Sequence, residues 1–386
     1  MTKPLLLLAC LLMLLGSCTG RSSQRTAATD SIVADSADFA HAVHFDHAKG
    51  IQVANHPGYK EVFIFTPDEP DTLARYILYP RDHKPEVTAP GARFIAVPVR
   101  TMGTLSTTEI GALTLLGLRD VLVACSDPRN INDSILAERT RRGEIAEIGR
   151  GMGRNVEQII ATHPEIIMQG LQESDAKDED IRASGIEIVF FNNWKEQSLL
   201  GRAEWMKFVG MLFGRNVRAE ETFQRIEREY LEAKKIAAQE PDFLPVLYGQ
   251  DYKGSWYVPG EYSYVTSMLT DAHIKYDFIP GQVANKPMSF EYVFSRHRHA
   301  PVWLSMMVGK DITLKDFLSM NERYQHFDAA KAGNVWIDRK RVNEYGGNDY
   351  WESGPYNPHL ILKDLIKITR PHLLPDYETT YWVKLQ

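Results

Sequence analysis

A long stretch near the middle of the chain contains neither glycine nor proline. Residues 216–239 are rich in Glu, Lys, Arg and Ala, which are strong helix formers. A continuous helix over this stretch would be about 36 Å long, at roughly 1.5 Å per residue, which is enough to connect two lobes. The sequence therefore predicts a connecting helix over 216–240. A plain surface helix is the alternative, and both can hold because the polar face would be exposed in either case.

Short apolar segments alternate with helical runs on both sides of this stretch. Such alternation is typical of a parallel sheet covered by helices. The predicted strands are Phe94–Val97, Val121–Ala124, Ile166–Met168, Ile188–Phe191, Pro245–Tyr248, Val302–Ser305 and Val335–Ile337. The predicted helices beside the connecting one are Ser106–Leu116, Val156–Thr162 and His359–Thr369. We expect an α/β protein with two Rossmann-like lobes, residues 93–215 and 241–386, which have central, mainly parallel sheets and are joined by a long rigid helix.

The N-terminus has the features of a secretion signal. Lys3 precedes an unbroken apolar run from Leu5 to Leu15, and this run is shorter than the roughly 20 residues that cross a bilayer. The ending Leu-Gly-Ser-Cys resembles a lipobox, which implies a signal peptide at 1–17 and a lipid on the thiol of Cys18. An ordinary secreted protein cut near Ser17 is the alternative. We expect a membrane-attached lipoprotein in the periplasm or elsewhere in the cell envelope.

The region that follows divides into two parts. Residues 18–45 contain few large apolar side chains, so burial cannot offset the entropy of ordering them, and we expect a flexible tether. Residues 46–92 contain three short segments of β-branched and aromatic residues with turn residues between them: Ile51–Val53, Glu61–Phe65 and Tyr76–Leu78. These segments predict a small β-rich N-terminal extension in front of the first lobe.

Charge and cysteine count exclude several classes of protein. The formal net charge is −6 and the basic residues are scattered, so we expect no nucleic-acid partner. Cys10 would leave with the signal peptide and Cys18 would carry the lipid, which leaves Cys125 without a partner and excludes a disulfide framework. We also expect a monomer with no cofactor and no metal-binding side-chain cluster.

A near-repeat links the two halves. Asn155-Val156-Glu157 precedes the strand at Ile166, and Ser289-Phe290-Glu291 precedes the strand at Val302. Asn155 and Ser289 can cap a helix, and Gln158 would complete a box-like cap in the first copy. Taken singly, each glutamate is explained by the helix dipole, which contributes about 0.3 to 1 kcal/mol. The matched pair suggests one exposed carboxylate on each lobe, suited to arginines of a membrane partner.

Several short motifs together resemble a known family. They are Ser106-Thr107-Thr108-Glu109-Ile110, Leu115-Leu116-Gly117-Leu118, Asn155-Val156-Glu157, Pro164-Glu165-Ile166-Ile167, Gly254-Ser255-Trp256-Tyr257-Val258-Pro259-Gly260, Ser267 to Asp271, Phe290-Glu291 and Asn348-Asp349-Tyr350-Trp351-Glu352. In order and spacing, from about Arg93 to Leu385, the chain is similar to the iron-siderophore, haem and cobalamin binding proteins of ABC importers, whose lobes are joined by a helix.

The resemblance implies partners and roles. Glu157 and Glu291 would dock on arginines of an ABC permease with its ATPase, and the ligand would be a ferric siderophore or haem, with cobalamin as the alternative. The segment before Arg93 and the stretch Gly346–Trp351 depart from the more familiar members and resemble a lipoprotein branch of the family. These departures leave the ligand class open.

The predicted ligand site follows from the topology of such sheets. Ligands bind at loops that follow the carboxyl ends of the strands, and aromatic walls with a few arginines suit a flat conjugated ligand or a catecholate complex. The residues placed there are Arg100, Met102, Trp194, Tyr252, Trp256, Tyr262, Met306, Tyr350 and Trp351. Each aromatic residue could instead belong to the core.

An enzymatic reading finds little support in the sequence. The chain has no Gly-x-Ser-x-Gly elbow and no Gly-Lys-Ser phosphate loop. His297 with His299, and His41 with His44 and His47, lack the supporting ligands of a recognised metal site. We expect no enzyme; a chelatase-like activity or an envelope docking role on the same scaffold are the alternatives.

Overall fold

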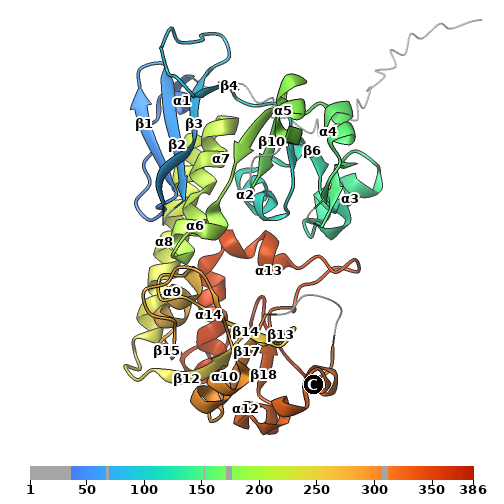
Figure 1. The fold of residues 1–386 in the computed structure, drawn as a ribbon. Helices are drawn as coiled ribbons and strands as arrows, with labels where there is room; N and C mark the ends of the chain where they lie inside the picture. The colour runs from blue at the N-terminus through green and yellow to red at the C-terminus, as the bar shows by residue number, and fades with distance from the viewer. Residues whose placement is uncertain (1–35, 67–68, 152, 171–175, 307–311) are drawn as a thin grey trace, which may run out of the picture. The chain divides into compact units, whose positions relative to one another are not determined.

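The computed structural model describes residues 36–66, 69–151, 153–170, 176–306 and 312–386, which belong to one compact unit. The predicted signal peptide and Cys18 lie outside the described residues. Figure 1 shows the order of the elements along the chain. Within the described ranges, no helix is long and apolar enough to cross a membrane.

The N-terminal extension is a four-stranded sheet. Its strands are β1 (Ile51–His56), β2 (Tyr59–Thr66), β3 (Glu69–Pro80) and β4 (Arg93–Val97). The first three form an antiparallel meander, as predicted, with a turn at Gly58, whose φ is 83°. β4 pairs in parallel with β3. The prediction that this strand belongs to the first lobe is wrong, because its apolar residues complete the N-terminal sheet. The sheet of the first lobe begins with the next strand.

The sheet of the first lobe has the order β11-β10-β5-β6-β7, with every neighbouring pair parallel. The strands are β5 (Met102–Thr104), β6 (Leu122–Cys125), β7 (Ala146–Glu147), β10 (Ile166–Gln169) and β11 (Glu187–Phe190), and a small hairpin is formed by β8 (Gly149–Arg150) and β9 (Gly153–Arg154). The helices are α2 (Thr108–Leu116), α3 (Ser134–Arg141), α4 (Val156–Thr162), α5 (Ala176–Ala183), α6 (Leu199–Glu204) and α7 (Met206–Phe213). The predicted helix at 106–116 thus begins two residues later than expected.

The second lobe repeats this architecture. Its sheet has the order β15-β12-β17-β18-β19, and only β19 is antiparallel to its neighbour. The strands are β12 (Leu244–Tyr248), β15 (Ile274–Lys275), β17 (Val302–Ser305), β18 (Val335–Ile337) and β19 (Val383–Lys384), with a second sheet of β13 (Asp251–Tyr252), β14 (Ser255–Val258) and β16 (Lys286–Met288). The helices are α9 (Tyr264–Asp271), α10 (Phe290–His297), α11 (Leu314–Ser319), α12 (Asp328–Lys331), α13 (Asp349–Glu352) and α14 (Pro358–Thr369). Two lobes with mainly parallel sheets are therefore confirmed.

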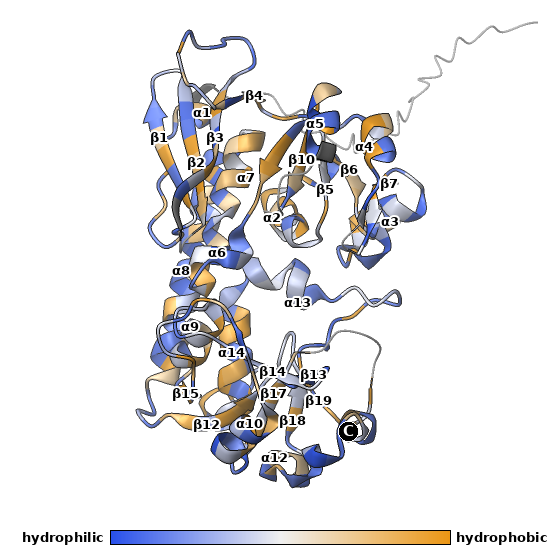
Figure 2. Cartoon of the chain, in the orientation of Figure 1, coloured by the Kyte–Doolittle hydropathy of each residue, from blue (hydrophilic) through white to orange (hydrophobic). Residues whose placement is uncertain are grey.

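The connecting helix is α8 (Asn216–Ala237), which packs against α7 of the first lobe and α14 of the second. Its buried residues recur at intervals of three or four, as an amphipathic helix requires: Ala219, Phe223, Ile226, Tyr230, Ala233 and Ala237. In contrast, all residues of α7 are buried, and Figure 2 shows this helix as hydrophobic on its visible face. A continuous helix between the lobes agrees with the prediction over 216–240.

The segment before the first strand is docked on the first lobe. Helix α1 (Ser36–Ala40) carries Asp38, whose carboxylate accepts hydrogen bonds from the backbone N–H groups of Asn216 and Val217 and so caps α8. The predicted tether over 18–45 is therefore too long, because its last residues belong to the folded unit. The physical reason is a long-range cap, which the local composition does not reveal.

Two buried carboxylates fix the chain just before β1. Glu204 accepts hydrogen bonds from the backbone N–H groups of residues 46, 47 and 48, and its charge is balanced by Lys207, 3.1 Å away. Glu196 accepts from the N–H groups of residues 49 and 50 and from the indole of Trp205. Both glutamates lie in the first lobe, so the N-terminal sheet is held to that lobe by hydrogen bonds to ionised groups, which are among the stronger ones.

Candidate ligand-binding site

A cavity lies at the carboxyl ends of the parallel strands of the first lobe. Strands β5, β6, β10 and β11 lead into Leu105, Ser126, Gly170 and Phe191, and all four residues line a cavity of about 460 Å³. Crevices at this edge are the usual binding sites of such sheets. The volume falls within the roughly 300–1,000 Å³ of small-molecule pockets. This cavity, called the strand-end cavity below, is the candidate site.

Glu109 places a buried carboxyl in the lining of the strand-end cavity. It stands in the first turn of α2 and is 2% exposed. Its Oε2 accepts a hydrogen bond of 2.9 Å from the hydroxyl of Thr104, the last residue of β5. Burial raises the pKa of Glu109 to about 8, against the hydrogen bonds that favour the ionised form. At neutral pH the side chain is therefore mostly a neutral carboxylic acid, which can donate a hydrogen bond to a ligand oxygen.

A charged pair, Arg154 and Asp178, contributes to the wall of the strand-end cavity. Arg154 is the last residue of the β8–β9 hairpin and donates to Asp178 of α5, which is 1% exposed, and to the amide oxygen of Gln169 at 3.2 Å. Arg154 and Gln169 both line the strand-end cavity. Because Asp178 balances the guanidinium charge, this pair gives the wall polar groups without a net charge.

Trp194 provides the aromatic part of the wall. It is 50% exposed and lines the strand-end cavity, as predicted for a residue that follows the fourth strand. Its indole Nε1 would lie 3.2 Å from a Cβ added to Gly170, so glycine at that position leaves room for the ring. The ammonium of Lys195 lies 5.4 Å from the ring centroid. An exposed indole over a cavity is a suitable surface for a flat conjugated ligand.

Four of the six predicted residues of the second lobe are exposed or half-buried. Tyr252 on β13 is 57% exposed and Tyr262 is 50% exposed, so both are open to solvent. Met306 is half-buried and accepts a hydrogen bond from the hydroxyl of Tyr248, and Trp351 is half-buried against the core. None of these four lines the strand-end cavity.

Three predicted ligand residues are core residues in this structure. Met102 in β5 is fully buried, as is Trp256 in β14, which packs against Trp303 with 5.9 Å between ring centroids. Tyr350 is 2% exposed and packs against Tyr381. Their side chains fill the interior between sheets and helices, so they offer no surface to a ligand here. We do not retain them in the candidate site.

Arg100 lies at a different place from the one expected. It stands between β4 and β5, and lines a second cavity that borders the N-terminal sheet. The displacement follows from the membership of β4 in that sheet, because the chain turns there before it enters the first lobe. Arg100 is therefore not part of the strand-end cavity.

Residues 341–357 of the second lobe, called the inter-lobe strap below, contact the first lobe directly. The carboxylate of Glu352 accepts hydrogen bonds from the backbone N–H groups of Asn132 at 2.6 Å and Asp133 at 2.8 Å, at the start of α3. The side-chain amide of Asn343 donates to the carbonyl oxygens of Arg129 and Ile131. Residues on both sides of the departing stretch Gly346–Trp351 thus bridge the two lobes.

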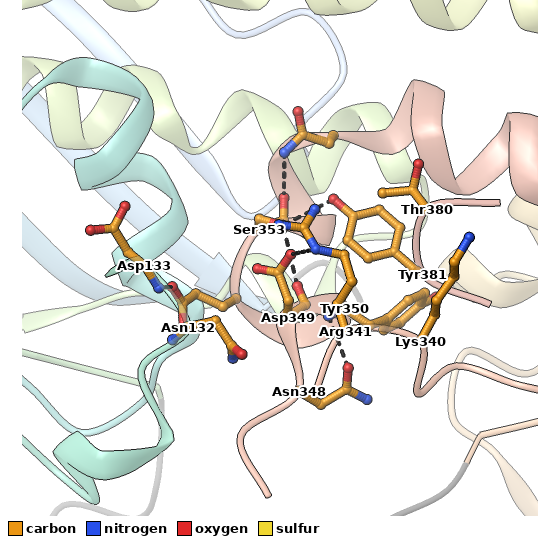
Figure 3. A network of polar contacts seen from close by, with 12 residues as sticks. Asn132, Asp133, Lys340, Arg341, Asn348, Asp349, Tyr350, Ser353, Thr380 and Tyr381 are labelled. Atoms are coloured by element: carbon orange, nitrogen blue, oxygen red, sulfur yellow. Dashed lines mark hydrogen bonds and ion pairs between the residues drawn. The ribbon is translucent and has the colours of Figure 1, made fainter. Parts of the chain in front are cut away.

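The strap is supported by its own polar network, shown in Figure 3. The guanidinium of Arg341 pairs with Asp349 at 3.1 Å, and the hydroxyl groups of Ser353 and Tyr381 lie 2.9 Å apart. The fit to the first lobe is close: a Cβ added to Gly347 would lie 2.0 Å from the carbonyl oxygen of Asn130. Only glycine permits this approach of two backbones.

Replacing Glu352 with alanine should loosen the strap. Burial raises the pKa of Glu352 to about 7, so the test is made at pH 8, where the side chain is ionised. The change then leaves two backbone N–H groups of the first lobe without their acceptor, and a lost hydrogen bond to an ionised group costs about 1.5–3 kcal/mol. Hydrogen exchange at the amides of Asn132 and Asp133 should accelerate about tenfold or more, as followed by NMR or mass spectrometry. Glu344→Ala in the same strap removes an exposed carboxylate and should leave this exchange unchanged. Equal exchange in both variants would contradict the assigned role of Glu352.

The two paired glutamates are both accessible. Asn155 accepts a hydrogen bond from the backbone N–H of Gln158, and Ser289 accepts one from Tyr292, so both predicted caps are confirmed. Gln158 does not complete the box, because its amide lies 3.5 Å from Thr162 instead. Glu157 in α4 is exposed, and Glu291 in α10 has a side chain that is 75% exposed.

Glu291 has a partner in this structure. Its carboxylate accepts a hydrogen bond of 2.9 Å from Arg323, whose guanidinium also lies over the ring of Phe290. The hydrogen bond to its own backbone N–H and the proximity of Arg323 lower the pKa of Glu291. Because an exposed ion pair contributes little stability, another arginine can replace Arg323 as the partner at low cost.

The histidines that the sequence analysis considered as metal ligands have other contacts in the structure. His297 is 6% exposed in α10 and stacks on Tyr276 with ring centroids 4.4 Å apart, so it is a core residue. His47 pairs with Glu227 and His299 with Asp328. No group of three potential metal ligands occurs in the part of the chain that the structure describes.

Sequence reasoning missed most of the polar groups of the strand-end cavity. Glu109 and Arg154 follow strands or turns at the ligand-binding edge, and the carboxyl of Glu109 in an otherwise apolar helix was a usable signal. Gln169 is the last residue of β10, where a polar residue ends an apolar strand. The partnership of Glu352 with Asn132 has no such local signal.

The chain is similar in sequence to known proteins. A family model described as periplasmic binding protein matches residues 104–342. An uncharacterised lipoprotein of Methanocaldococcus jannaschii is 25% identical over 262 residues, which is 66% of this chain but only 59% of that relative's length.

Two solved structures show the same fold. A possible iron-binding periplasmic solute-binding protein of Staphylococcus epidermidis matches with a TM-score of 0.55 and 17% identity, over 71% of this chain and 99% of that one. A periplasmic haem-binding protein of Pseudomonas aeruginosa matches with a TM-score of 0.53 and 15% identity, over 73% and 95%. With more than half of the sequence matched by the family model, the chain belongs to the periplasmic binding protein family.

Proposed function

We propose that this protein is a lipid-anchored, extracytoplasmic receptor that captures an iron complex, a ferric siderophore or haem, and delivers it to an ABC permease. The observation that carries the proposal is the strand-end cavity, which opens beside an exposed indole at the ligand-binding edge of a family member's sheet. The neutral acid of Glu109 and the balanced pair of Arg154 and Asp178 suit the oxygen atoms of a chelate.

Further support comes from the N-terminal sequence of this chain and from the names of similar proteins. The ending Leu-Gly-Ser-Cys before residue 19 resembles a lipobox, and a relative is named a lipoprotein. Two similar structures are named as iron-binding and haem-binding. Glu157 and Glu291 offer one accessible carboxylate on each lobe for the permease. In this function the protein binds and releases its ligand without converting it.

A visible absorption titration tests the proposal. The purified protein is titrated with haem, with a panel of ferric siderophores and with cobalamin. A saturable spectral change with haem or a ferric siderophore is the expected result. A change with cobalamin alone would assign the protein to the corrinoid branch of the same function, and turnover of any ligand would favour a chelatase-like enzyme instead.

The same titration checks the position of the site. Trp194→Ala should weaken binding of the identified ligand about tenfold, since loss of an aromatic stacking surface costs about 1.4 kcal/mol or more. Phe243→Ala is a matched control, because Phe243 is 44% exposed and precedes the amino end of β12. Unchanged binding in the Trp194 variant would place the ligand elsewhere.

A further inference from the structure

A second cavity lies outside the strand-end cavity, beside the N-terminal sheet. It has a volume of about 740 Å³ and shares no lining residue with the candidate site. Its walls come from the β1–β2 turn, the ends of β3 and β4, helix α1 and Gly214. We call it the extension cavity, because the N-terminal extension supplies most of it.

A buried ammonium group belongs to its lining. Lys60 is 3% exposed, and its Nζ donates to the carbonyl oxygen of His41 at 2.8 Å and to the side-chain oxygen of Asn55 at 2.9 Å. Over the described ranges, no carboxylate forms an ion pair with it. Burial lowers the pKa of Lys60 to about 8, while the charge of Asp38 opposes this shift. The side chain is therefore still mainly charged at neutral pH, and one N–H bond remains for a third acceptor.

A second cation at this cavity is also without a counter-ion. The backbone N–H of Arg100 donates to Glu165 at 3.0 Å, but its guanidinium forms no ion pair with any residue that the structure describes. Glu165 is already paired with Arg81, which donates to both of its carboxylate oxygens. Arg81 and Arg100 both line the cavity, and the only acid in the lining is Asp82, which is exposed. Neither Lys60 nor Arg100 is therefore ion-paired with an acid of the cavity wall.

The wall also has an apolar part that is well fixed. Phe39, Pro57, Pro80, Val97 and Pro98 line it. The backbone of proline has little freedom, and Phe39 is held in place because the neighbouring Asp38 caps α8. The ammonium of Lys60 lies 5.4 Å from the ring centroid of Phe39, so a positive group adjoins the apolar part of the wall.

We propose that the extension cavity is a second binding site, which takes a small amphipathic anion: a carboxylate on a short apolar or aromatic body. The carboxylate would accept hydrogen bonds from Lys60 and Arg100, and the body would cover the proline and phenylalanine wall. Charge-assisted hydrogen bonds of this kind are strong where water is partly excluded. This site is distinct from the strand-end cavity and does not depend on the identity of the transported ligand.

Isothermal titration calorimetry of the full chain tests the site with phenylbutyrate. Phenylbutyramide has the same body without the charge, and inorganic phosphate has the charge without the body. We expect saturable binding of phenylbutyrate, and binding at least about tenfold weaker for both controls, equal to roughly 1.4 kcal/mol. Equal binding of the acid and the amide, or no binding of the acid at millimolar concentration, would overturn the proposal. Equal binding of phosphate would overturn its amphipathic part.

Variants locate the binding. Arg100→Met and Lys60→Met should each weaken phenylbutyrate binding about tenfold. The first should not disturb folding, because the guanidinium of Arg100 forms no ion pair with any described residue. Arg93→Met is the matched control, since Arg93 is exposed at the opposite end of β4. Trp194→Ala, in the other cavity, should also leave this binding unchanged. Loss of binding in the Trp194 variant, with normal binding in the Arg100 variant, would assign the anion to the strand-end cavity.

Discussion

Replacing Glu157 and Glu291 together with alanine should abolish ligand uptake and leave ligand affinity unchanged. Both carboxylates are exposed in the first turn of a helix, one on each lobe, and neither lines the strand-end cavity. Two hydrogen-bonded pairs with arginines of a permease would be lost at once. At about 1.5–3 kcal/mol for each charged hydrogen bond, the docking constant should fall by a factor of about a hundred or more.

Uptake by cells and binding by the purified protein separate the possible outcomes. The control variant carries Glu221→Ala and Glu232→Ala, which remove two exposed carboxylates from α8, and it should transport normally. If ligand affinity falls in the Glu157 and Glu291 variant, these residues belong to a ligand site. If both affinity and uptake are normal, docking uses other residues.

Glu109→Gln should stabilise the folded protein strongly at alkaline pH. The folded state holds the proton of Glu109 up to a pKa of about 8, whereas an exposed glutamate loses it near 4.5. The folded wild type therefore binds more protons than the unfolded chain, and the stability from this buried acid is fully present below pH 4.5 and is lost as the pH rises through 8. The upper limit of the loss is on the order of 5 kcal/mol. The variant should not show this loss, because the amide of glutamine does not ionise.

Denaturant unfolding at pH 5 and at pH 9 measures this effect. The wild type should lose stability between the two values, and the variant should lose less. The remaining loss comes from other buried acids, chiefly Glu352 and Asp364, whose pKa values burial raises to about 7 and about 6. The neighbouring thiol of Cys125 adds little up to pH 9, because burial raises its pKa in the folded state and an exposed thiol only begins to ionise there. Glu144→Gln, which changes an exposed carboxylate, should retain the slope of the wild type. A slope as steep in the Glu109 variant as in the wild type would show that another group is responsible.

The elements with strong periodicity were predictable from the sequence. Strands β17 and β18 and helix α4 have the bounds that their apolar patterns indicated, and α8 begins at the expected residue. The failure concerns β4 and β5. The pattern Phe94–Val97 indicates a strand but not the sheet to which it belongs, and β5 has only three residues with a glycine in the middle. Pairing partners are a long-range property that composition does not encode.

The candidate site was predictable only in its location. The rule of strand ends led to Trp194, which lines the strand-end cavity, but it also led to Trp256 and Tyr350, which are buried. A tryptophan in the core and one at a cavity have the same local sequence signals, because only packing distinguishes them. The polar neighbours of the cavity come from loops and helix starts, where the sequence gives weak periodicity.

The docking of the N-terminal segment has a consequence for the order in which the chain acquires its structure. The hydrogen bonds from residues 46–48 end on Glu204, more than 150 residues away along the chain. A polypeptide that is made from its N-terminus presents these donors long before their acceptor has been synthesised. The N-terminal sheet can therefore complete its attachment only after the whole first lobe has been made. Until then its buried edge stays accessible to chaperones and proteases.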